Sequence, residues 1–243
     1  IEAVAEISKP DPRCDGLPPF VLKRLTHLQS RIEAEGHAIR FAVSRGPLNV
    51  ASFLLGNTEF LTALRMTPEP IHHLLEIITD FTVDWLQLQA KTFPTIDGVL
   101  ILDDIVGFLG EEDFLRFAEP HLRAVFQALD VTVRFFHNDA PGRICAPHLA
   151  GLGVNLFNFS HEHSLAEMRE WTGGEVTLLG NIPPRDVMAD GTPEEVRRAV
   201  RHAIDPLDDT RRLILSCGGG MPPGAPTENI EAFLDACGHR LKR

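Results

Sequence analysis

The feature that most constrains the fold is the repeated alternation of short apolar segments with longer segments of helical periodicity. Strands that are apolar along their whole length and are separated by helices are typical of a parallel sheet buried on both faces. Six segments have the length and composition of such strands: residues 38–43, 97–103, 131–136, 154–159, 175–180 and 212–216.

The segments between these strands carry helix signals. Thr67 followed by Pro68 predicts a helix start, because threonine caps a helix and proline is favoured at its first position. Thr192 and Glu195 have the spacing of a capping box, and Pro120 predicts a kink. The expected helices cover residues 19–35, 67–91, 111–129, 192–204 and 229–241.

This order of elements predicts an α/β fold of the TIM (β/α)8-barrel type, in one domain that spans residues 1–243. Eight strands close a standard barrel, so we expect that N-terminal βα units of the barrel lie outside this chain. An open, doubly wound six-stranded sheet is the alternative.

Composition narrows the class of partner. The net charge of −11 argues against nucleic acid or an anionic membrane as the main partner. No apolar run has the length of a membrane span, and the four scattered cysteines form no CxxC motif. We therefore expect a cytoplasmic protein with reduced thiols.

Polar residues follow the predicted strands, where parallel α/β folds build their sites. His137 and Asp139 follow one strand at positions i and i+2, which project to the same side, and Cys217 ends another. Three such ligands with an open fourth position are the arrangement of catalytic zinc. The alternative is that Cys217 is a small buried apolar residue and that the His-x-Asp spacing has no metal role.

Other candidates have competing structural interpretations. Asp103 and Asp104 end a strand and could contact substrate, orient a histidine or act as an acid, or Asp104 could cap a helix. Backbone amides of Gly218-Gly219-Gly220 could approach an anionic group, or this segment could be a tight turn. His161-Glu162-His163 could supply ligands or form a polar loop. His72-His73 lies within a predicted helix and is expected to be structural or to lie on the surface. No Walker, GxGxxG, GxSxG or HExxH motif is present.

Four ordered segments resemble motifs of the uroporphyrinogen decarboxylase/cobamide-dependent methyltransferase superfamily. The family patterns are GPxTLAxxLxG, DxxxGxLSPEDF, GNVDP…GTPEEV and GCGIPPxTPxENI. The matching segments are residues 45–56, 102–114, 180–184 with 191–196, and 217–230.

The resemblance implies a TIM barrel and two branches of chemistry. The decarboxylase branch works without metal and carries an early RQAGRY motif, which is absent here. The methyltransferase branch moves methyl groups between a corrinoid protein and a thiol, with zinc held by His-x-Cys and a distant Cys. The matching positions are His137, Asp139 and Cys217. An aspartate therefore replaces the middle cysteine of the family's ligand set, and its carboxylate is a harder metal ligand than a thiolate.

We therefore expect a zinc-dependent methyltransferase that acts on a small-molecule methyl donor or acceptor, with the corrinoid carried by a partner protein. His137, Asp139 and Cys217 would hold the zinc, and Asp103 and Cys217 would be catalytic. Expected substrate contacts are Asp104, Asn181, Gly218 and Gly219. The alternatives are a metal-free decarboxylase, in which Asp103 stabilises a developing cation, and a non-catalytic protein that binds metal or tetrapyrrole.

Overall fold

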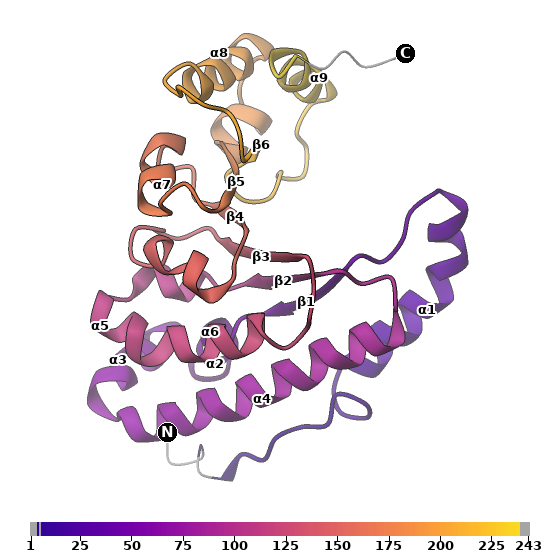
Figure 1. Ribbon diagram of the computed structural model, residues 1–243, viewed down its shortest axis with the longest axis vertical. Helices are drawn as coiled ribbons and strands as arrows, with labels where there is room; N and C mark the ends of the chain where they lie inside the picture. Colours follow the sequence, from indigo (N-terminus) through magenta and orange to yellow (C-terminus); the bar gives the residue numbers. More distant parts are fainter. Residues whose placement is uncertain (1–3, 5, 239–243) are drawn as a thin grey trace.

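The fold is described by a computed structural model that covers residue 4 and residues 6–238. Six strands alternate with helices (Figure 1). The strands are β1 (Phe41–Arg45), β2 (Gly98–Leu102), β3 (Val133–Asn138), β4 (Leu156–Phe159), β5 (Thr177–Ile182) and β6 (Leu213–Cys217). The α-helices are α1 (Pro18–Ala34), α2 (Pro47–Leu55), α3 (Asn57–Met66), α4 (Pro68–Thr92), α5 (Glu111–Asp113), α6 (Glu119–Phe126), α7 (Leu165–Trp171), α8 (Pro193–Ile204) and α9 (Thr227–Ala236).

The strands form one parallel sheet in the chain order β1-β2-β3-β4-β5-β6. In Figure 1 they are stacked from the region of α4 at the bottom to that of α8 and α9 at the top. A doubly wound sheet reverses its strand order at a switch point, whereas barrel strands follow one another. The order confirms the α/β fold of TIM-barrel type and excludes the doubly wound alternative.

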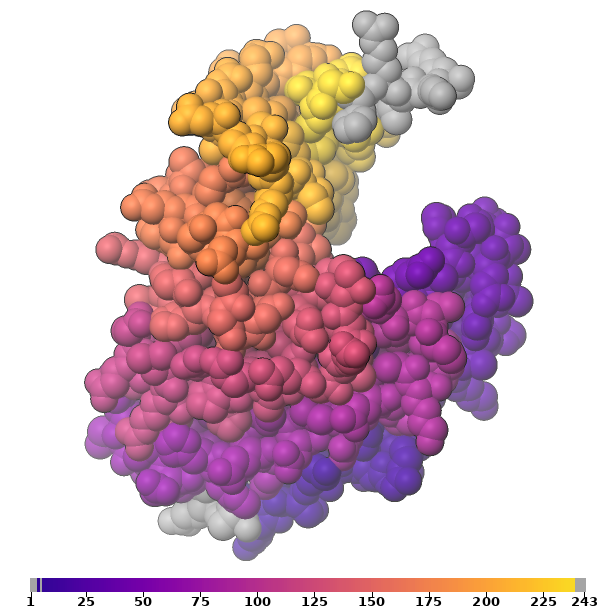
Figure 2. Space-filling model, in the orientation of Figure 1, coloured from indigo at the N-terminus to yellow at the C-terminus, as the bar shows by residue number. Residues whose placement is uncertain are grey.

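The two faces of the sheet differ in burial. Alternate strand residues that face the helices are fully buried, among them Val99, Ile101 and Phe136. The other set points to the inner face, where Val43 of β1 is 40% exposed and Ile214 of β6 is 48% exposed. Figure 2 shows the molecule hollowed between α1, in indigo and purple, and the yellow C-terminal region. The helix side therefore forms the core, and the inner face lies open.

The outer edge of β1 is capped by side chains of α4. The Gln89 amide accepts a hydrogen bond from Val43 N (3.0 Å) and donates one to Val43 O (3.1 Å). Trp85 Nε1 donates to the same carbonyl (3.1 Å). Exposed strand edges invite pairing with other chains. Here the side chains of α4 satisfy the backbone N–H and C=O of Val43, which a further strand would otherwise bond.

Helix features that were predicted from capping residues and proline are present in the structure. Thr192 and Glu195 form a capping box at the start of α8. The expected kink near Pro120 is a π-helical turn over Phe114–Ala118, after which α6 begins at Glu119. This helix ends at Phe126 rather than at residue 129.

Several predicted bounds are wrong by a few residues. β1 begins and ends later than residues 38–43, because Arg45 pairs with Leu102 and the Gly46 amide bonds to the Leu102 carbonyl at 2.8 Å. Helices α2 and α3 were not predicted, and Pro47 occupies the first turn of α2. The closing helix α9 runs over Thr227–Ala236, while residues 239–241 of its predicted range lie outside the described residues. No described helix combines the length and apolar character needed to cross a bilayer.

Candidate functional site

A histidine–carboxylate pair lies at the carboxyl end of β3. His137 is on the inner face of the strand, and Asp139 follows it in the loop. The two atoms His137 Nε2 and Asp139 Oδ2 are 3.3 Å apart. Burial opposes protonation of the imidazole, but the hydrogen bond and charge of Asp139 outweigh it, so the pKa of His137 is raised. The side chains at positions 137 and 139 therefore lie next to each other, as their spacing predicts, while their role as metal ligands stays a prediction.

Asn158 of β4 fixes the other side of the His137 ring. Its Nδ2 group donates to the carbonyls of Leu179 (2.7 Å) and Cys217 (3.1 Å), which orients its Oδ1 toward His137 Nδ1 (2.7 Å). Nδ1 must then carry a proton, since an amide oxygen only accepts. In the neutral ring the lone pair of Nε2 therefore faces Asp139, where it can bind a proton or a metal ion.

The spacing of the pair fits two ligands of a tetrahedral zinc ion. Zn–N and Zn–O bonds of about 2.0–2.2 Å at a tetrahedral angle separate the two ligand atoms by roughly 3.3–3.5 Å. A histidine ligand that donates its second N–H to an oxygen, as His137 does to Asn158, is also the usual arrangement around protein-bound metals. The donor chemistry of these two residues fits the predicted metal.

The structure does not bring Cys217 to this pair. Side chains alternate along β6, so Cys217 points away from the inner face and packs in an apolar cluster with Ile182, Met188 and Val196. It is 4% exposed, and burial raises the pKa of its thiol. Within the described part of the chain, no group of three His, Cys, Asp or Glu side chains is placed to hold a metal. The third ligand of the predicted set is therefore missing from the arrangement.

The glycine loop after β6 closes against the loops of β3 and β4. A methyl group on Gly219, whose φ is +96°, would lie 2.5 Å from Asp139 Oδ1. One on Gly218 would lie 2.6 Å from the His161 amide nitrogen. Both glycines allow close approach of this loop, so they contribute to the site through their lack of a side chain.

Asp103 has a different environment from the one predicted for a catalytic acid. Its side chain is fully buried, and its two oxygens accept the amides of Leu48 (2.9 Å) and Asn49 (3.0 Å) in the first turn of α2. Burial raises its pKa to about 8, against the effect of these hydrogen bonds. A Cβ at Gly46 would collide with this carboxylate. The side chain of Asp103 therefore connects the end of β2 to the first turn of α2 through hydrogen bonds.

Asp104 and Asn181, both predicted substrate contacts, lie at strand ends on either side of the pair. Asp104 Oδ1 accepts the amide of Asp139 (2.8 Å), and its Oδ2 is 3.9 Å from Arg45 NH1. Asn181 Nδ2 donates to the carbonyl of His163. Asp104 thus reaches the His137–Asp139 pair directly, whereas Asn181 braces the loop after β4.

Comparison with known proteins identifies the family of this chain. The profile described as uroporphyrinogen decarboxylase (URO-D) matches residues 1–240. The chain belongs to the uroporphyrinogen decarboxylase family. The family is enzymatic, which agrees with the resemblance of the four motifs.

Family members with two different names are similar to this chain. It is 27% identical to a uroporphyrinogen decarboxylase of Syntrophotalea carbinolica over 230 residues, covering 92% of this chain and 65% of the relative. It is 25% identical to a methylated-thiol–coenzyme M methyltransferase of Methanosarcina mazei over 219 residues, covering 90% and 58%. A solved methyltransferase structure from Methanosarcina mazei superposes with a TM-score of 0.80 at 19% identity, covering 96% of this chain and 68% of that one.

These comparisons fix the fold and the uroporphyrinogen decarboxylase family but do not choose between the two chemistries. The chain spans less than two thirds of the length of the two curated relatives described. The reaction, substrate and partners of the whole protein are therefore matters of proposal.

Two of the other histidines considered in the sequence analysis, His72 and His163, have structural partners. His72 stacks on Phe117 with ring centroids 4.5 Å apart, as expected for a structural residue. His163 Nε2 accepts the amide of Gly142 (3.1 Å), and its ring packs edge-on against Trp171. His163 therefore holds loops together, which is the polar-loop interpretation of this segment.

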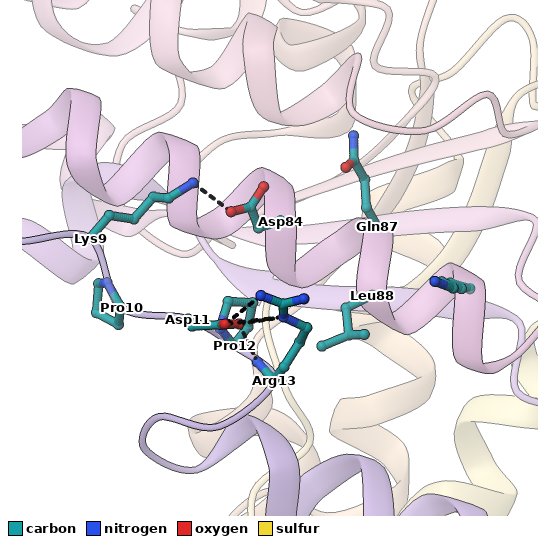
Figure 3. A pocket seen from close by; sticks show the side chains of 9 residues that line it. Lys9, Pro10, Asp11, Pro12, Arg13, Asp84, Gln87 and Leu88 are labelled. Atoms are coloured by element: carbon teal, nitrogen blue, oxygen red, sulfur yellow. Dashed lines mark hydrogen bonds and ion pairs between the residues drawn. The ribbon is translucent and has the colours of Figure 1, made fainter.

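A separate hollow of about 440 Å³ lies between the N-terminal segment and α4, and none of the site residues lines it (Figure 3). Lys9 is paired with Asp84 at 2.6 Å, and Arg13 with Asp11 at 2.7 Å. These charged groups are partnered by one another, so the hollow adds nothing to the site.

Two site residues were not singled out from the sequence. Asn158 lies in an otherwise apolar segment, and the pairing of β3 with β4 places it opposite His137 on the inner face. Arg45 lies beyond the predicted strand 38–43, and only the register of β1 reveals that it lies on the inner face. Polar residues within apolar segments are the signal that could have identified Asn158.

Proposed function

We propose that this chain is a methyltransferase that moves a methyl group between a corrinoid protein and the heteroatom of a small molecule such as a thiol. The observation that carries the proposal is the His137–Asp139 pair, whose two donor atoms have the spacing of adjacent zinc ligands. The carboxylate of Asp103 is buried and bound to amides, which disfavours the decarboxylase alternative in which Asp103 faces a substrate.

Each residue of the site has a defined part in this proposal. His137 supplies Nε2 and Asp139 supplies Oδ2 as ligands, and Asn158 holds the ring by its bond to Nδ1. Asp104 fixes the backbone of Asp139. Zinc, when bound, supplies a Lewis acid that lowers the pKa of a coordinated thiol. The corrinoid would arrive on a partner protein, since this sequence has no DxHxxG cobalamin signature.

Metal content tests the first part of the proposal. We expect about one zinc per chain in the purified wild type, measured by mass spectrometry, and its loss in His137→Ala and Asp139→Ala. Zinc retained by Cys217→Ala would agree with the position of this thiol in the apolar cluster, whereas loss would indicate that the thiol turns toward the pair on metal binding. A folded wild type that binds no zinc contradicts the proposed site.

Turnover tests the second part. We expect the zinc-loaded protein to transfer the methyl group of methylcobalamin to a thiol, followed by the change in corrinoid absorbance. His137→Ala should abolish this transfer. Decarboxylation of a porphyrinogen without methyl transfer would favour the decarboxylase alternative, and zinc binding without either reaction would favour a non-catalytic binding protein.

A further inference from the structure

Arg45 lies in the same row of the sheet as the His137–Asp139 pair. Arg45 is opposite Leu102, Leu102 is opposite His137, and His137 is opposite Asn158. Residues in one row point to the same face, and neighbouring strands are about 4.8 Å apart. The Cα atoms of Arg45 and His137 are therefore roughly 10 Å apart, with both side chains on the open inner face.

The guanidinium of Arg45 has unused hydrogen-bonding capacity. Its side chain is 50% exposed, and Asp104 Oδ2, at 3.9 Å, is the only carboxylate oxygen within 4 Å among the described residues. That distance is beyond a hydrogen bond. The Phe53 ring lies 6.0 Å away, at the limit of a cation–π contact. Arg45 is oriented by its neighbours while its donors remain available.

The backbone at Arg45 is firmly held. Gly46 donates to the Leu102 carbonyl at 2.8 Å and lies directly against Asp103. Asp103 in turn binds the first turn of α2. A long side chain on a fixed strand end is suited to binding rather than to holding the fold together, because an exposed ion pair such as Arg45–Asp104 contributes little stability.

We propose that Arg45 is a specificity-determining residue that binds an oxyanion group of the substrate, while the reacting heteroatom lies at the His137–Asp139 pair. The planar fork of arginine matches a carboxylate, sulfonate or phosphate with two parallel hydrogen bonds. A chain with a net charge of −11 needs a local cation to bind an anionic molecule. The substrate class is therefore a small molecule with a nucleophilic heteroatom at one end and an oxyanion at the other, and this assignment rests on the proposed function.

Anion binding can be measured without any turnover. Nuclear magnetic resonance would follow the Arg45 Nε–H signal and the Gly46 amide during titration with propionate, with inorganic phosphate and with neutral propionamide. We expect one or both anions to shift these signals and propionamide to leave them unchanged. In Arg45→Gln, with the Gly46 signal as the readout, the anion affinity should fall by about tenfold or more. Arg45→Lys should lose less, since it keeps the charge without the fork.

Arg40→Gln is the matched control, because Arg40 is exposed and lies just before the opposite end of the same strand. It removes the same charge and should bind the anions as the wild type does. Equal anion affinity in the wild type and Arg45→Gln, or no binding of either anion, overturns the proposal. Response to propionate alone would identify a carboxylate, and response to phosphate alone a phosphate group.

A second readout separates this proposal from the function on which it rests. With methylcobalamin as donor, we expect the KM for 3-mercaptopropionate to be lower than that for 3-mercaptopropanol, and Arg45→Gln to remove the difference with little change in kcat. His137→Ala should abolish transfer but retain anion binding. Anion binding at Arg45 in a wild type that transfers no methyl group would contradict the proposed function alone.

Discussion

At the scale of single residues, the site depends on side chains that orient one another. Asn158 makes three hydrogen bonds with its one amide group, to His137 and to two carbonyls. These bonds fix the direction in which the His137 lone pair points. The donor set is thus prepared by a residue that would itself touch neither metal nor substrate.

Replacement of Asn158 by leucine should weaken the metal site while leaving its ligands in place. Loss of an outer hydrogen bond to a ligating histidine typically lowers metal affinity by about 10–100-fold. Zinc affinity measured by competition with a chelator, together with a thermal unfolding curve, tests this expectation. Unchanged affinity in folded Asn158→Leu would indicate that His137 needs no such support.

Gly219 should tolerate no side chain. Gly219→Ala places a methyl group against Asp139 and keeps a φ of +96°, so we expect a loss of about 1–3 kcal/mol in the free energy of unfolding and weaker zinc binding. Gly220→Ala is the control in the same loop, because a Cβ there meets nothing within 4 Å. Urea denaturation of both variants compares them, and equal stabilities would contradict the close approach.

Cys145 should be inert in the native protein. It is buried, its Sγ lies 3.3 Å from the Gly142 carbonyl, and burial raises its pKa to about 12. The reactive thiolate is therefore scarce at pH 8. We expect iodoacetamide at this pH to alkylate the exposed Cys14 but not Cys145, as read by mass spectrometry of peptides. Labelling in guanidinium chloride should reach both, and rapid native labelling of Cys145 would contradict its burial.

At the scale of elements, α4 acts as a partner for the edge of the sheet as well as a cover. Gln89 offers both an acceptor and a donor to Val43, in the manner of a neighbouring strand. This contact holds the middle of β1 against the C-terminal half of α4. The edge of β1 is closed at its centre by side chains instead of backbone.

Gln89→Leu should therefore destabilise the fold. It leaves the part-buried Val43 N–H without its acceptor, which costs about 1 kcal/mol or more. Gln87→Leu is the control, since Gln87 is exposed on the same helix two residues earlier. Thermal or urea unfolding distinguishes the two, and similar curves would indicate that water replaces the lost bonds.

At the scale of the whole molecule, the two edges of the sheet are unequal. β1 is capped by α4, whereas the edge of β6 borders an apolar groove lined by Leu213, Leu215 and Phe233. In a parallel strand, every second residue bonds to the same neighbouring strand. Gly218 N bonds to β5, and Leu215 lies three residues earlier, so the Leu215 amide faces the free edge of the sheet. The open inner face lies between these two edges.

Hydrogen exchange should report this difference. We expect the Val43 amide, which donates to Gln89, to exchange about tenfold or more slowly than the Leu215 amide, since unpaired edge amides open easily. Amides of β3 and β4 should be the slowest. Exchange resolved by residue with nuclear magnetic resonance measures all three, and a protected Leu215 amide would mean that something covers the β6 edge.

The sequence by itself determined the order of the six strands, the parallel sheet and the helix starts at Pro68 and Thr192. These follow from local chemistry: apolar segments of strand length, proline at the first helical turn and a capping box. The i, i+2 spacing of His137 and Asp139 was enough to place them together, because both belong to one strand end.

Only the tertiary structure decided which side of the sheet the remaining candidate site residues face. Register and side-chain alternation, which depend on pairing between distant segments, put Arg45 and Asn158 on the inner face and Cys217 on the helix side. They also turned Asp103 toward α2, a helix that the sequence analysis did not predict. A shift of one residue in a strand reverses the direction of every side chain, so local patterns identified the strands but not the members of the site.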